Sequence, residues 1–413
     1  FLTLSIVIII PLGVSYFNRD YAKRVTLTTI QALKDIKEAI YQPDFQITHG
    51  PYICSLNDKG EMYVVWKTNR PALSWVELAS ETTGQTAKFH ETRSGRKAST
   101  KTLHTIKLDN LTSDSRYNYH IHSQEKKGVK HSMYADFGIH ISSEDFRDHP
   151  YQFKTFSDST AECSFAVFND IHGNNQLMRE LSQGVDFKKL DFVTLNGDMV
   201  GAVDNEEVLF SEYIDNTVNL FATETPIIWV RGNHEVIGAY ADSMYDYFPN
   251  SNNQYYYMFM VGNIAFLVLD SGEYILDEEW ENEYGKGLAR FEPYRKEEAK
   301  WIAEVTQSDQ FRNADFRIAF LHICPLYGQS TIKKELHEVF SPVLNNVNID
   351  LMLSGHHHDY AYHPSNDQID YPVIINGDES LLRCNITKDE IQISIRDIKL
   401  NKTITHSFPK KRK

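Results

Sequence analysis

The sequence predicts an α/β domain preceded by a smaller all-β domain. Short runs that alternate between polar and apolar residues occupy residues 45–152. From residue 153 to residue 413, runs that are apolar throughout alternate with longer helical stretches. Alternation with a period of two is typical of half-buried strands, whereas fully apolar runs indicate strands that are covered on both faces. A chain of 413 residues is long enough for two or three domains.

Residues 45–152 carry the pattern of a β-sandwich of about a hundred residues. Turn-forming residues separate four short alternating runs, which we expect to be strands: Met62–Lys67, Ser74–Leu78, Thr102–Leu108 and Tyr117–Ile121. The segment Leu111–Tyr117 resembles the corner of fibronectin type III domains, where a tyrosine hydroxyl bonds back to the preceding loop. We therefore expect a fibronectin-III-like sandwich here.

The apolar runs of the second part are expected to form its sheets. These runs are Ser164–Phe168, Leu190–Leu195, Pro226–Val230, Ile264–Leu269, Phe316–Leu321, Ile349–Leu353 and Tyr371–Ile375. Between them, Glu292–Val305 reads as a helix that buries Ala299, Trp301, Ile302 and Val305. Two alternating segments near the end, Glu390–Ile398 and Thr403–Phe408, predict a closing hairpin.

The first 44 residues are read separately from both domains. Residues 1–17 form an apolar run that suits a signal peptide or an uncleaved anchor. Residues 18–44 carry helical periodicity and are expected to be a helical linker. We therefore expect an exported protein, either periplasmic, cell-surface or secreted, that contacts a membrane only through this possible anchor.

Charge and cysteine usage narrow the classes of partner and site. A net charge of -14 argues against a nucleic-acid partner, because phosphate binding needs a face dominated by Lys and Arg. The cysteines Cys54, Cys163, Cys324 and Cys384 form no CxxC pair and are expected to be small buried residues. Cys163 and Cys384 can pair only if their strands lie together, which the sequence leaves open.

Polar clusters follow five of the apolar runs directly. They contain Asp170, His172 and Asn174; Asp198; Asn233, His234 and Glu235; His322; and His356, His357 and His358. Ligands of α/β sheets bind outside the carboxyl ends of the strands, so we expect these clusters to gather at one edge. Each cluster alone is weak, because Asn-Gly-Asp is more often a turn and a lone histidine more often a satisfied core residue. Five in succession form a strong signal.

Pooled, these side chains predict a transition-metal site. Mixed carboxylate and imidazole ligands suit Fe, Mn, Zn or Ni, whereas Ca and Mg prefer oxygen alone. Seven or more ligands exceed what one ion needs, so two divalent ions that share a carboxylate are expected. Two ions roughly 3.5–4 Å apart clamp the attacking and leaving oxygens of a phosphoryl displacement.

The order Asp-x-His, Gly-Asp, Gly-Asn-His-Glu, His, Gly-His-x-His resembles the calcineurin-like metallophosphoesterases, a family that includes the purple acid phosphatases. The resemblance covers roughly residues 160–408. The preceding sandwich, which starts at Ile47–Tyr52, looks like the N-terminal domain of purple acid phosphatases. The resemblance implies a four-layer α/β/β/α domain with two facing sheets and a site above their edges.

Carried over by motif, the resemblance implies a role for each polar residue. Asp198 would bridge the two ions, and His234 would act as a general acid toward the leaving oxygen. The first ion would be held by Asp170, His172, Asp198 and His358, and the second by Asp198, Asn233, His322 and His356. Weaker substrate-binding candidates are Asn174, His357 and Glu235, the last of which is also a candidate for orienting His234.

One departure from the purple enzymes concerns the residue three positions after the bridging aspartate. Gly201 stands where those enzymes carry the tyrosine ligand that colours their ferric centre. In the first motif, His172 occupies a position where the purple enzymes lack a histidine. We therefore expect a colourless dimetal site in which His172 replaces the tyrosine as a ligand.

These observations favour a hydrolase that cleaves phosphomonoesters, acid-phosphatase-like, through a hydroxide bridging the two metals. A phosphodiesterase or nucleotidase with the same metal site is the closest alternative. A surface binding protein with a vestigial metal domain is a further alternative, disfavoured by the complete ligand set. A nuclease conflicts with the acidic charge. The expected partner is a small phosphate ester, and the sequence leaves the oligomeric state open.

Overall fold

A computed structural model of the chain describes residues 44–54, 61–130, 134–159, 162–250, 254–284, 287–326 and 330–411. The predicted signal peptide or anchor (1–17) and the helical linker (18–44), apart from its last residue, lie outside these ranges and stay predictions. Among the helices of the described ranges, none combines the length and the apolar character needed to span a membrane. Residues 46–413 form one compact unit.

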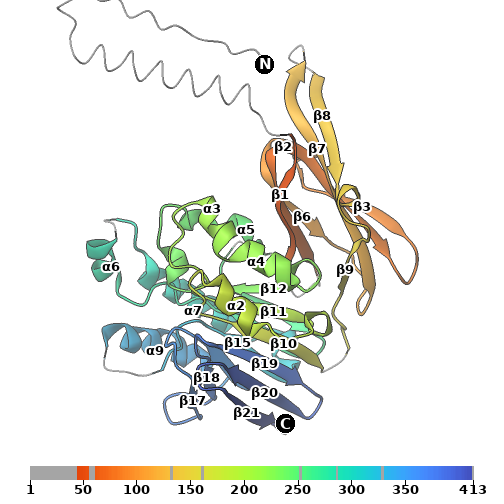
Figure 1. The fold of residues 1–413 in the computed structure, drawn as a ribbon. Coiled ribbons are helices and arrows are strands. Elements are labelled where there is room, and N and C mark those ends of the chain that lie inside the picture. Colours follow the sequence, from red (N-terminus) through yellow and green to blue (C-terminus); the bar gives the residue numbers. More distant parts are fainter. Residues whose placement is uncertain are drawn as a thin grey trace, which may run out of the picture. The chain divides into compact units, whose positions relative to one another are not determined.

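The first part of this unit is built from strands, as the alternating pattern predicts (Figure 1). Its strands are β1 (Ile47–Cys54), β2 (Met62–Ser80), β3 (Thr86–His90), β4 (Thr92–Arg93), β5 (Arg96–Lys97), β6 (Lys101–Leu108), β7 (Arg116–Lys130), β8 (Tyr134–Ser142) and β9 (Tyr151–Lys154). The predicted strands 62–67 and 74–78 are in fact one long strand, β2, whose pairing with β6 shifts register between Lys67 and Ala72. Beyond this register shift, β2 pairs with β7 instead of continuing its regular pairing with β6.

The predicted tyrosine corner is present. The Tyr117 hydroxyl accepts a hydrogen bond of 2.8 Å from the backbone N–H of Thr112. This bond ties the start of β7 to the loop that precedes it. The N-terminal β region therefore fits a fibronectin-III-like domain.

The second part contains two sheets, and every apolar run predicted there forms a strand. The first sheet continues β1 through β12 (Ile227–Val230), β11 (Phe192–Asn196), β10 (Cys163–Phe168), β19 (Ser380–Ile386), β20 (Glu390–Asp397) and β21 (Lys402–Pro409). The second runs in the order β13 (Tyr257–Val261), β14 (Ile264–Val268), β15 (Phe316–Phe320), β16 (Leu351–Ser354), β18 (Val373–Ile375) and β17 (Ala361–His363). Strands β10, β11 and β12 are parallel, as are β14, β15, β16 and β18.

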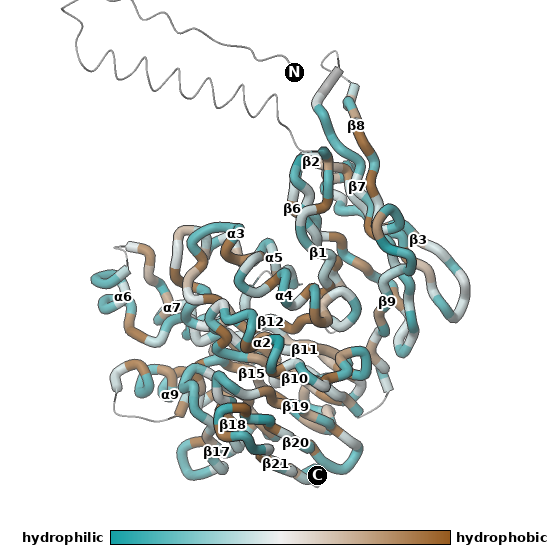
Figure 2. Tube along the Cα trace, in the orientation of Figure 1, coloured by the Kyte–Doolittle hydropathy of each residue, from teal (hydrophilic) through white to brown (hydrophobic). Residues whose placement is uncertain are grey.

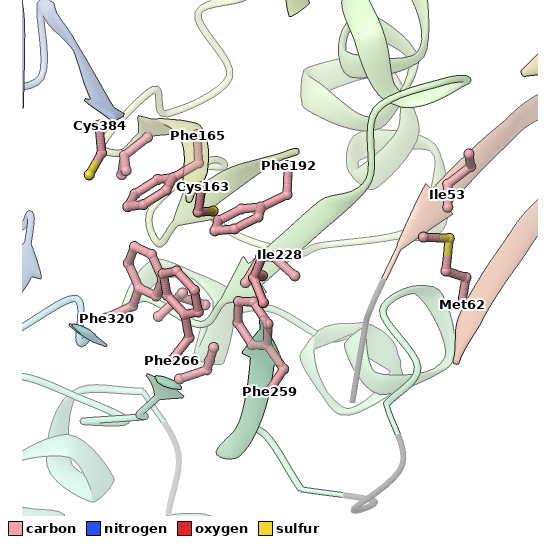
Figure 3. Packing of buried hydrophobic residues seen from close by; sticks show 14 of the residues in the cluster. Ile53, Met62, Cys163, Phe165, Phe192, Ile228, Phe259, Phe266, Phe320 and Cys384 are labelled. Atoms are coloured by element: carbon pink, nitrogen blue, oxygen red, sulfur yellow. The ribbon is translucent and has the colours of Figure 1, made fainter. Parts of the chain in front are cut away.

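The two sheets pack face to face on an aromatic core. Phe165 and Phe192 of the first sheet stack at 4.8 Å, and Phe165 meets the edge of Phe266 from the second sheet at 5.8 Å (Figure 3). Such edge-to-face pairs contribute about 0.5–1.5 kcal/mol beyond the buried area. Hydrophobic residues accordingly concentrate on the central strands, whereas α6 is largely hydrophilic (Figure 2).

Helices cover the outer face of each sheet, which confirms the predicted α/β/β/α layers. The helical segments packed on the first sheet include α2 (Asn175–Leu181), α3 (Glu206–Leu209), α5 (Met244–Tyr247) and the π-helical turns Phe210–Ile214 and Val218–Ala222. The short helix α4 (Asp215–Thr217) lies between the two π-helical turns. Those packed on the second sheet include α7 (Phe291–Val305), α8 (Asp309–Asn313) and α9 (Thr331–Leu344). A short acidic helix, α6 (Asp277–Glu283), precedes α7.

The buried face of α7 differs from the predicted one. Ile302 is buried as expected, but Ala299, Trp301 and Val305 are only partly buried. The helix instead buries Arg295 and Glu298 completely. A hydrophobic periodicity argument misses such residues, because burial of charged side chains depends on partners from other elements.

The cysteine prediction is confirmed, since all four side chains are buried and free. Strands β10 and β19 are neighbours, but their register places Cys163 opposite Ile386 and Cys384 opposite Phe165.

Candidate metal centre

The structure brings the five polar clusters together at one edge of the two sheets. Each cluster follows the carboxyl end of a parallel strand: β10, β11 and β12 in the first sheet, β15 and β16 in the second. Parallel neighbours end on the same side, so their terminal loops meet there. Three groups of side chains lie close enough to share a metal ion: Asp170, His172 and His358; Asp198, His322 and His356; and His172, Asp198 and His234.

The first group surrounds one oxygen of Asp170. Asp170 Oδ1 lies 3.4 Å from His358 Nε2 and 3.9 Å from His172 Nε2. The two imidazole nitrogens face each other at 3.3 Å. These atoms come from the ends of β10 and β16, which belong to different sheets.

The second group surrounds His322. Its Nε2 lies 3.0 Å from Asp198 Oδ2 and 3.9 Å from Asp170 Oδ1, which links the two groups. His356 completes the group, and its Nδ1 lies 3.0 Å from the Asn233 amide oxygen. All seven predicted ligands therefore contribute to one connected cluster. Asp198 and His172 each belong to two of the three groups.

When His322 is neutral, two buried atoms of this cluster have no hydrogen-bond partner. They are Asp170 Oδ1 and His322 Nε2, and both side chains are closed to solvent. His322 Nδ1 lies 2.7 Å from the Asn196 carbonyl oxygen, so Nδ1 must carry a proton and donate it. A neutral His322 then directs the lone pair of Nε2 at two carboxylates. A cation between them removes this conflict, so the donor set fits metal ions.

The same charges shift the pKa values of the cluster. Burial alone would lower the pKa of His322, but the adjacent Asp198 and Asp170 carboxylates outweigh it and raise the pKa to about 10. Burial would raise the pKa of Asp198, yet the neighbouring His322 holds it below the ordinary value. Burial and the neighbouring His322 lower the pKa of His356 to about 4. The cluster thus binds either a proton or a cation at His322.

At two of the strand ends, a neighbouring side chain lies so close to the backbone that only glycine fits. A Cβ on Gly197, whose φ is +84°, would lie 2.4 Å from His322 Nδ1. A Cβ on Gly232 would lie 2.2 Å from Asp198 Oδ1. Both contacts are far inside van der Waals distance, so any side chain here would displace a ligand.

Most of the predicted ligands adopt a strained backbone. Asp170, His172, Asp198, His356 and His358 all have φ between +47° and +72°. Residues other than glycine rarely adopt this left-handed region, and the strain costs on the order of 1–3 kcal/mol each. Such outliers persist where the surrounding structure enforces them, and they are typical of functional sites.

His234 lies beside the cluster with its ring orientation fixed. Its Nδ1 donates to the Gly201 carbonyl oxygen at 2.6 Å, and its backbone N–H donates to Asp198 Oδ1 at 2.9 Å. The free Nε2 therefore faces the cluster, 3.9 Å from Asp198 Oδ2, and the ring stands edge to face with His172 at 4.6 Å.

Glu235 supports the loops that carry the ligands. It is fully buried, and its carboxylate accepts hydrogen bonds from the backbone N–H groups of Asp198, Met199 and Gly232 at 2.8–2.9 Å. Burial and the nearby Asp198 raise its pKa to about 7. The structure thus places Glu235 behind the metal centre, away from solvent.

The two other weak candidates lie at the periphery. The Asn174 side chain caps α2 by accepting a hydrogen bond of 3.0 Å from the Leu177 N–H. His357 is exposed, with its ring 5.4 Å from that of His356. Their predicted contacts with substrate stay predictions.

Comparison with known proteins agrees with this geometry. Residues 163–360 match the model of the calcineurin-like phosphoesterase family. These residues form a calcineurin-like phosphoesterase domain. The fold implies divalent metal ions, and the side chains gathered at its sheet edge are able to bind them. No curated protein sequence matches the chain.

Solved structures align with this chain at low sequence identity. A purple acid phosphatase, PPD1, from seeds of yellow lupin (Lupinus luteus) superposes with a TM-score of 0.61 and 13% identity, over 87% of this chain and 73% of its own. The protein TT1561 of Thermus thermophilus gives 0.37 and 14%, over 59% of this chain and 98% of its own. A 5'-nucleotidase from Candida albicans gives 0.33 and 11%, over 61% and 52%.

Within the calcineurin-like phosphoesterase domain, the departure at Gly201 has a structural counterpart. The Gly201 carbonyl oxygen orients His234, and a Cβ at this position would meet no atom within 4 Å. His172 meanwhile reaches Asp170 and His358 from the first motif. The domain thus has a histidine in the cluster and no tyrosine at position 201.

Sequence reasoning missed two buried asparagines that hold the Asp170 carboxylate in place through hydrogen bonds. The Asn169 amide donates to Asp170 Oδ2 at 2.6 Å, and Asn169 and Asn376 exchange hydrogen bonds of 2.7 Å and 3.1 Å. Both asparagines are buried. Asn169 directly precedes a ligand, which was a possible signal, but Asn376 stands 207 positions away and has no recognisable motif.

Proposed function

We propose that the protein hydrolyses phosphomonoesters with two divalent cations held by Asp170, His172, Asp198, Asn233, His322, His356 and His358. The observation that carries this proposal is the convergence of all seven side chains around two buried atoms, Asp170 Oδ1 and His322 Nε2, which lie 3.9 Å apart. The cations, when bound, would acidify water and withdraw charge from the phosphoryl oxygens. Fe, Mn, Zn and Ni all suit this mixed donor set.

The seven ligands divide between two positions. Asp170, His172 and His358 form one position, Asn233, His322 and His356 form the other, and Asp198 serves both. The distance of 3.9 Å between His322 Nε2 and Asp170 Oδ1 supports this division, because it places the two positions next to each other. Asn169 and Glu235 hold the carboxylate-bearing loops in place.

His234 would protonate the leaving oxygen. Its Nδ1 proton is committed to the Gly201 carbonyl, so Nε2 is the nitrogen available to substrate. In the imidazolium form, Nε2–H donates to the leaving alkoxide as the phosphorus–oxygen bond breaks. Its neighbours His172 and Asp198 belong to the metal cluster, so this proton lies beside the reacting phosphoryl group.

Phosphomonoesters are the proposed class because of the domain that precedes the metal centre. The yellow lupin purple acid phosphatase shares the fold over most of both chains, including a share of this chain larger than the phosphoesterase domain alone. Phosphodiesters and nucleotides are the competing substrates, since a dimetal site can hydrolyse each of them.

A metal-loaded ester panel tests the proposal. The purified protein is loaded separately with Mn, Zn, Fe or Ni and assayed with 4-nitrophenyl phosphate and bis(4-nitrophenyl) phosphate. We expect faster turnover of the monoester and its loss in the Asp198→Asn variant, whereas Asn174→Ala keeps most of it. A preference for the diester would redirect the proposal to a phosphodiesterase. Inactivity with every metal would refute phosphoester hydrolysis.

A further inference from the structure

An exposed tyrosine lies against one of the proposed metal ligands. Tyr274 follows β14 by a short loop, and its ring centroid lies 5.7 Å from that of His356. Its side chain is 36% exposed, although most large apolar and aromatic residues of the domain are buried. This tyrosine therefore presents an aromatic surface to solvent at the border of the metal centre.

Hydrogen bonds from buried side chains hold the loop that carries Tyr274. The fully buried Glu273 accepts a hydrogen bond of 2.7 Å from the Tyr274 N–H and one of 3.0 Å from the indole N–H of Trp280 in α6. Arg295 of α7, also fully buried, donates to the Ser271 carbonyl oxygen at 3.0 Å. Two fully buried side chains, Glu273 and Arg295, thus hold a loop in which the Tyr274 side chain is exposed.

A second exposed tyrosine belongs to the same group of rings. Tyr284, 39% exposed, follows α6 and packs on Trp280 with ring centroids 5.6 Å apart. Trp280 is buried and meets the edge of Phe291 at 5.7 Å. Glu273 thus links Tyr274 to the α6 rings through its bond to Trp280.

We propose that Tyr274, supported by Glu273, Trp280 and Tyr284, forms a subsite for an aromatic ring in the leaving group of the substrate. This inference rests on the proposed phosphoesterase function and specifies its substrate class as phosphate esters that carry an aryl group or a nucleobase. A rigid aromatic side chain loses little conformational entropy when it binds a ligand. Offset or edge-to-face contact with Tyr274 should therefore bind an aromatic ring of the substrate more tightly than a saturated ring of equal size. The contact of Tyr274 with His356 places this aromatic surface at the border of the proposed metal centre, next to the position proposed for the phosphoryl group.

The test compares two substrates that differ in the aromaticity of one ring. Benzyl phosphate and cyclohexylmethyl phosphate both release a primary alcohol, so their intrinsic reactivities are similar. We expect the metal-loaded wild-type protein to favour benzyl phosphate in kcat/KM by roughly two- to tenfold, the range of aromatic pair energies. Tyr274→Leu should bring the ratio close to one, and Tyr284→Leu should lower it less.

Two further variants test whether the aromatic ring of Tyr274 itself causes the preference for benzyl phosphate. Tyr274→Phe keeps the ring and should keep the ratio, whereas an equal loss in this variant would show that the hydroxyl group does the recognition. Tyr134→Leu, which changes a 65% exposed tyrosine on β8, is the matched control and should change nothing. Hydrolysis of both esters with a ratio that Tyr274→Leu leaves unchanged overturns the subsite alone. Failure of the wild type to hydrolyse either ester overturns the proposed function, and the subsite with it.

Discussion

His322 Nε2 lies 3.0 Å from Asp198 Oδ2, and solvent reaches neither group appreciably. The Asn196 carbonyl oxygen fixes the proton on the other nitrogen of the ring. Without a metal ion, this geometry is stable only as an imidazolium next to a carboxylate, which explains why the pKa of His322 is raised to about 10 despite burial. With a metal ion, the cation takes the place of that proton. Protonation and metal binding are therefore competing events at one atom.

Metal uptake should release a proton. Below pH 10 the metal-free protein holds a proton on His322 that a cation must displace, so metal affinity should rise with pH through the neutral range and level off near the pKa of about 10. Calorimetric titration with Zn in two buffers of different ionisation enthalpy measures the number of protons released. We expect about one from His322, and a reduced number in His322→Ala. Heats independent of the buffer would contradict this assignment.

Alanine at position 232 should remove metal from the site. The new Cβ would lie 2.2 Å from Asp198 Oδ1, so the proposed bridging carboxylate must move. We expect Gly232→Ala to weaken metal binding at least as much as loss of an outer-shell partner, which costs about 10–100-fold. The control is Gly201→Ala, because a Cβ there meets nothing within 4 Å. Equal metal content in both variants would show that Asp198 need not be held in this position.

Glu235→Gln should destabilise the fold as well as the site. The carboxylate accepts three backbone N–H bonds in a fully buried setting, and glutamine replaces one accepting oxygen with a donor. Leaving buried donors unpaired costs about 1–3 kcal/mol, so the free energy of unfolding in urea should fall by that amount. Asn174→Ala, which removes a helix cap, serves as a comparison with an expected cost of about 0.5–2 kcal/mol. An unchanged free energy of unfolding in Glu235→Gln would contradict the supporting role.

Replacement of His234 should slow the reaction without removing metal. General acid catalysis contributes roughly 10²–10⁴-fold, so His234→Gln should lower kcat by that factor for alkyl phosphates. The loss should be smaller for 4-nitrophenyl phosphate, because 4-nitrophenolate departs with less help from a proton. Metal content by elemental analysis is the control and should match the wild type. An equal loss for both kinds of leaving group would argue that His234 stabilises charge on the phosphoryl group instead.

The strands of the fold were predictable because they follow from local periodicity, whereas the four layers were implied by the family resemblance. Every apolar run of the second part became a strand, since burial on both faces leaves no polar positions in the sequence. The tyrosine corner at Tyr117 was predictable from its short-range motif. The buried charges of α7 were not predictable, because the partners of Arg295 and Glu298 lie outside α7. These partners are the Ser271 carbonyl oxygen, the Asp270 backbone N–H and the Glu335 carboxylate.

The candidate ligand residues of the proposed metal centre were visible in the sequence, but their geometry was not. Strand ends in an α/β sheet must converge, so pooling the motifs after β10, β11, β12, β15 and β16 located the cluster. The positive φ angles of residues such as Asp170 and His356 depend on the assembled structure, and no local sequence pattern predicts them. The partnership of Asn169 with Asn376 likewise arises only when β10 and the segment after β18 meet.

Anomalous diffraction from crystals of the protein loaded with Zn tests the central claim most directly. Data collected above and below the zinc absorption edge locate the ions without reference to the protein coordinates. We predict two peaks roughly 3.5–4 Å apart, the spacing of two-metal phosphoryl-transfer sites, with Asp198 between them and His322 Nε2 and Asp170 Oδ1 as direct ligands. Absence of any peak among these side chains, or peaks only at surface histidines elsewhere, would contradict the account.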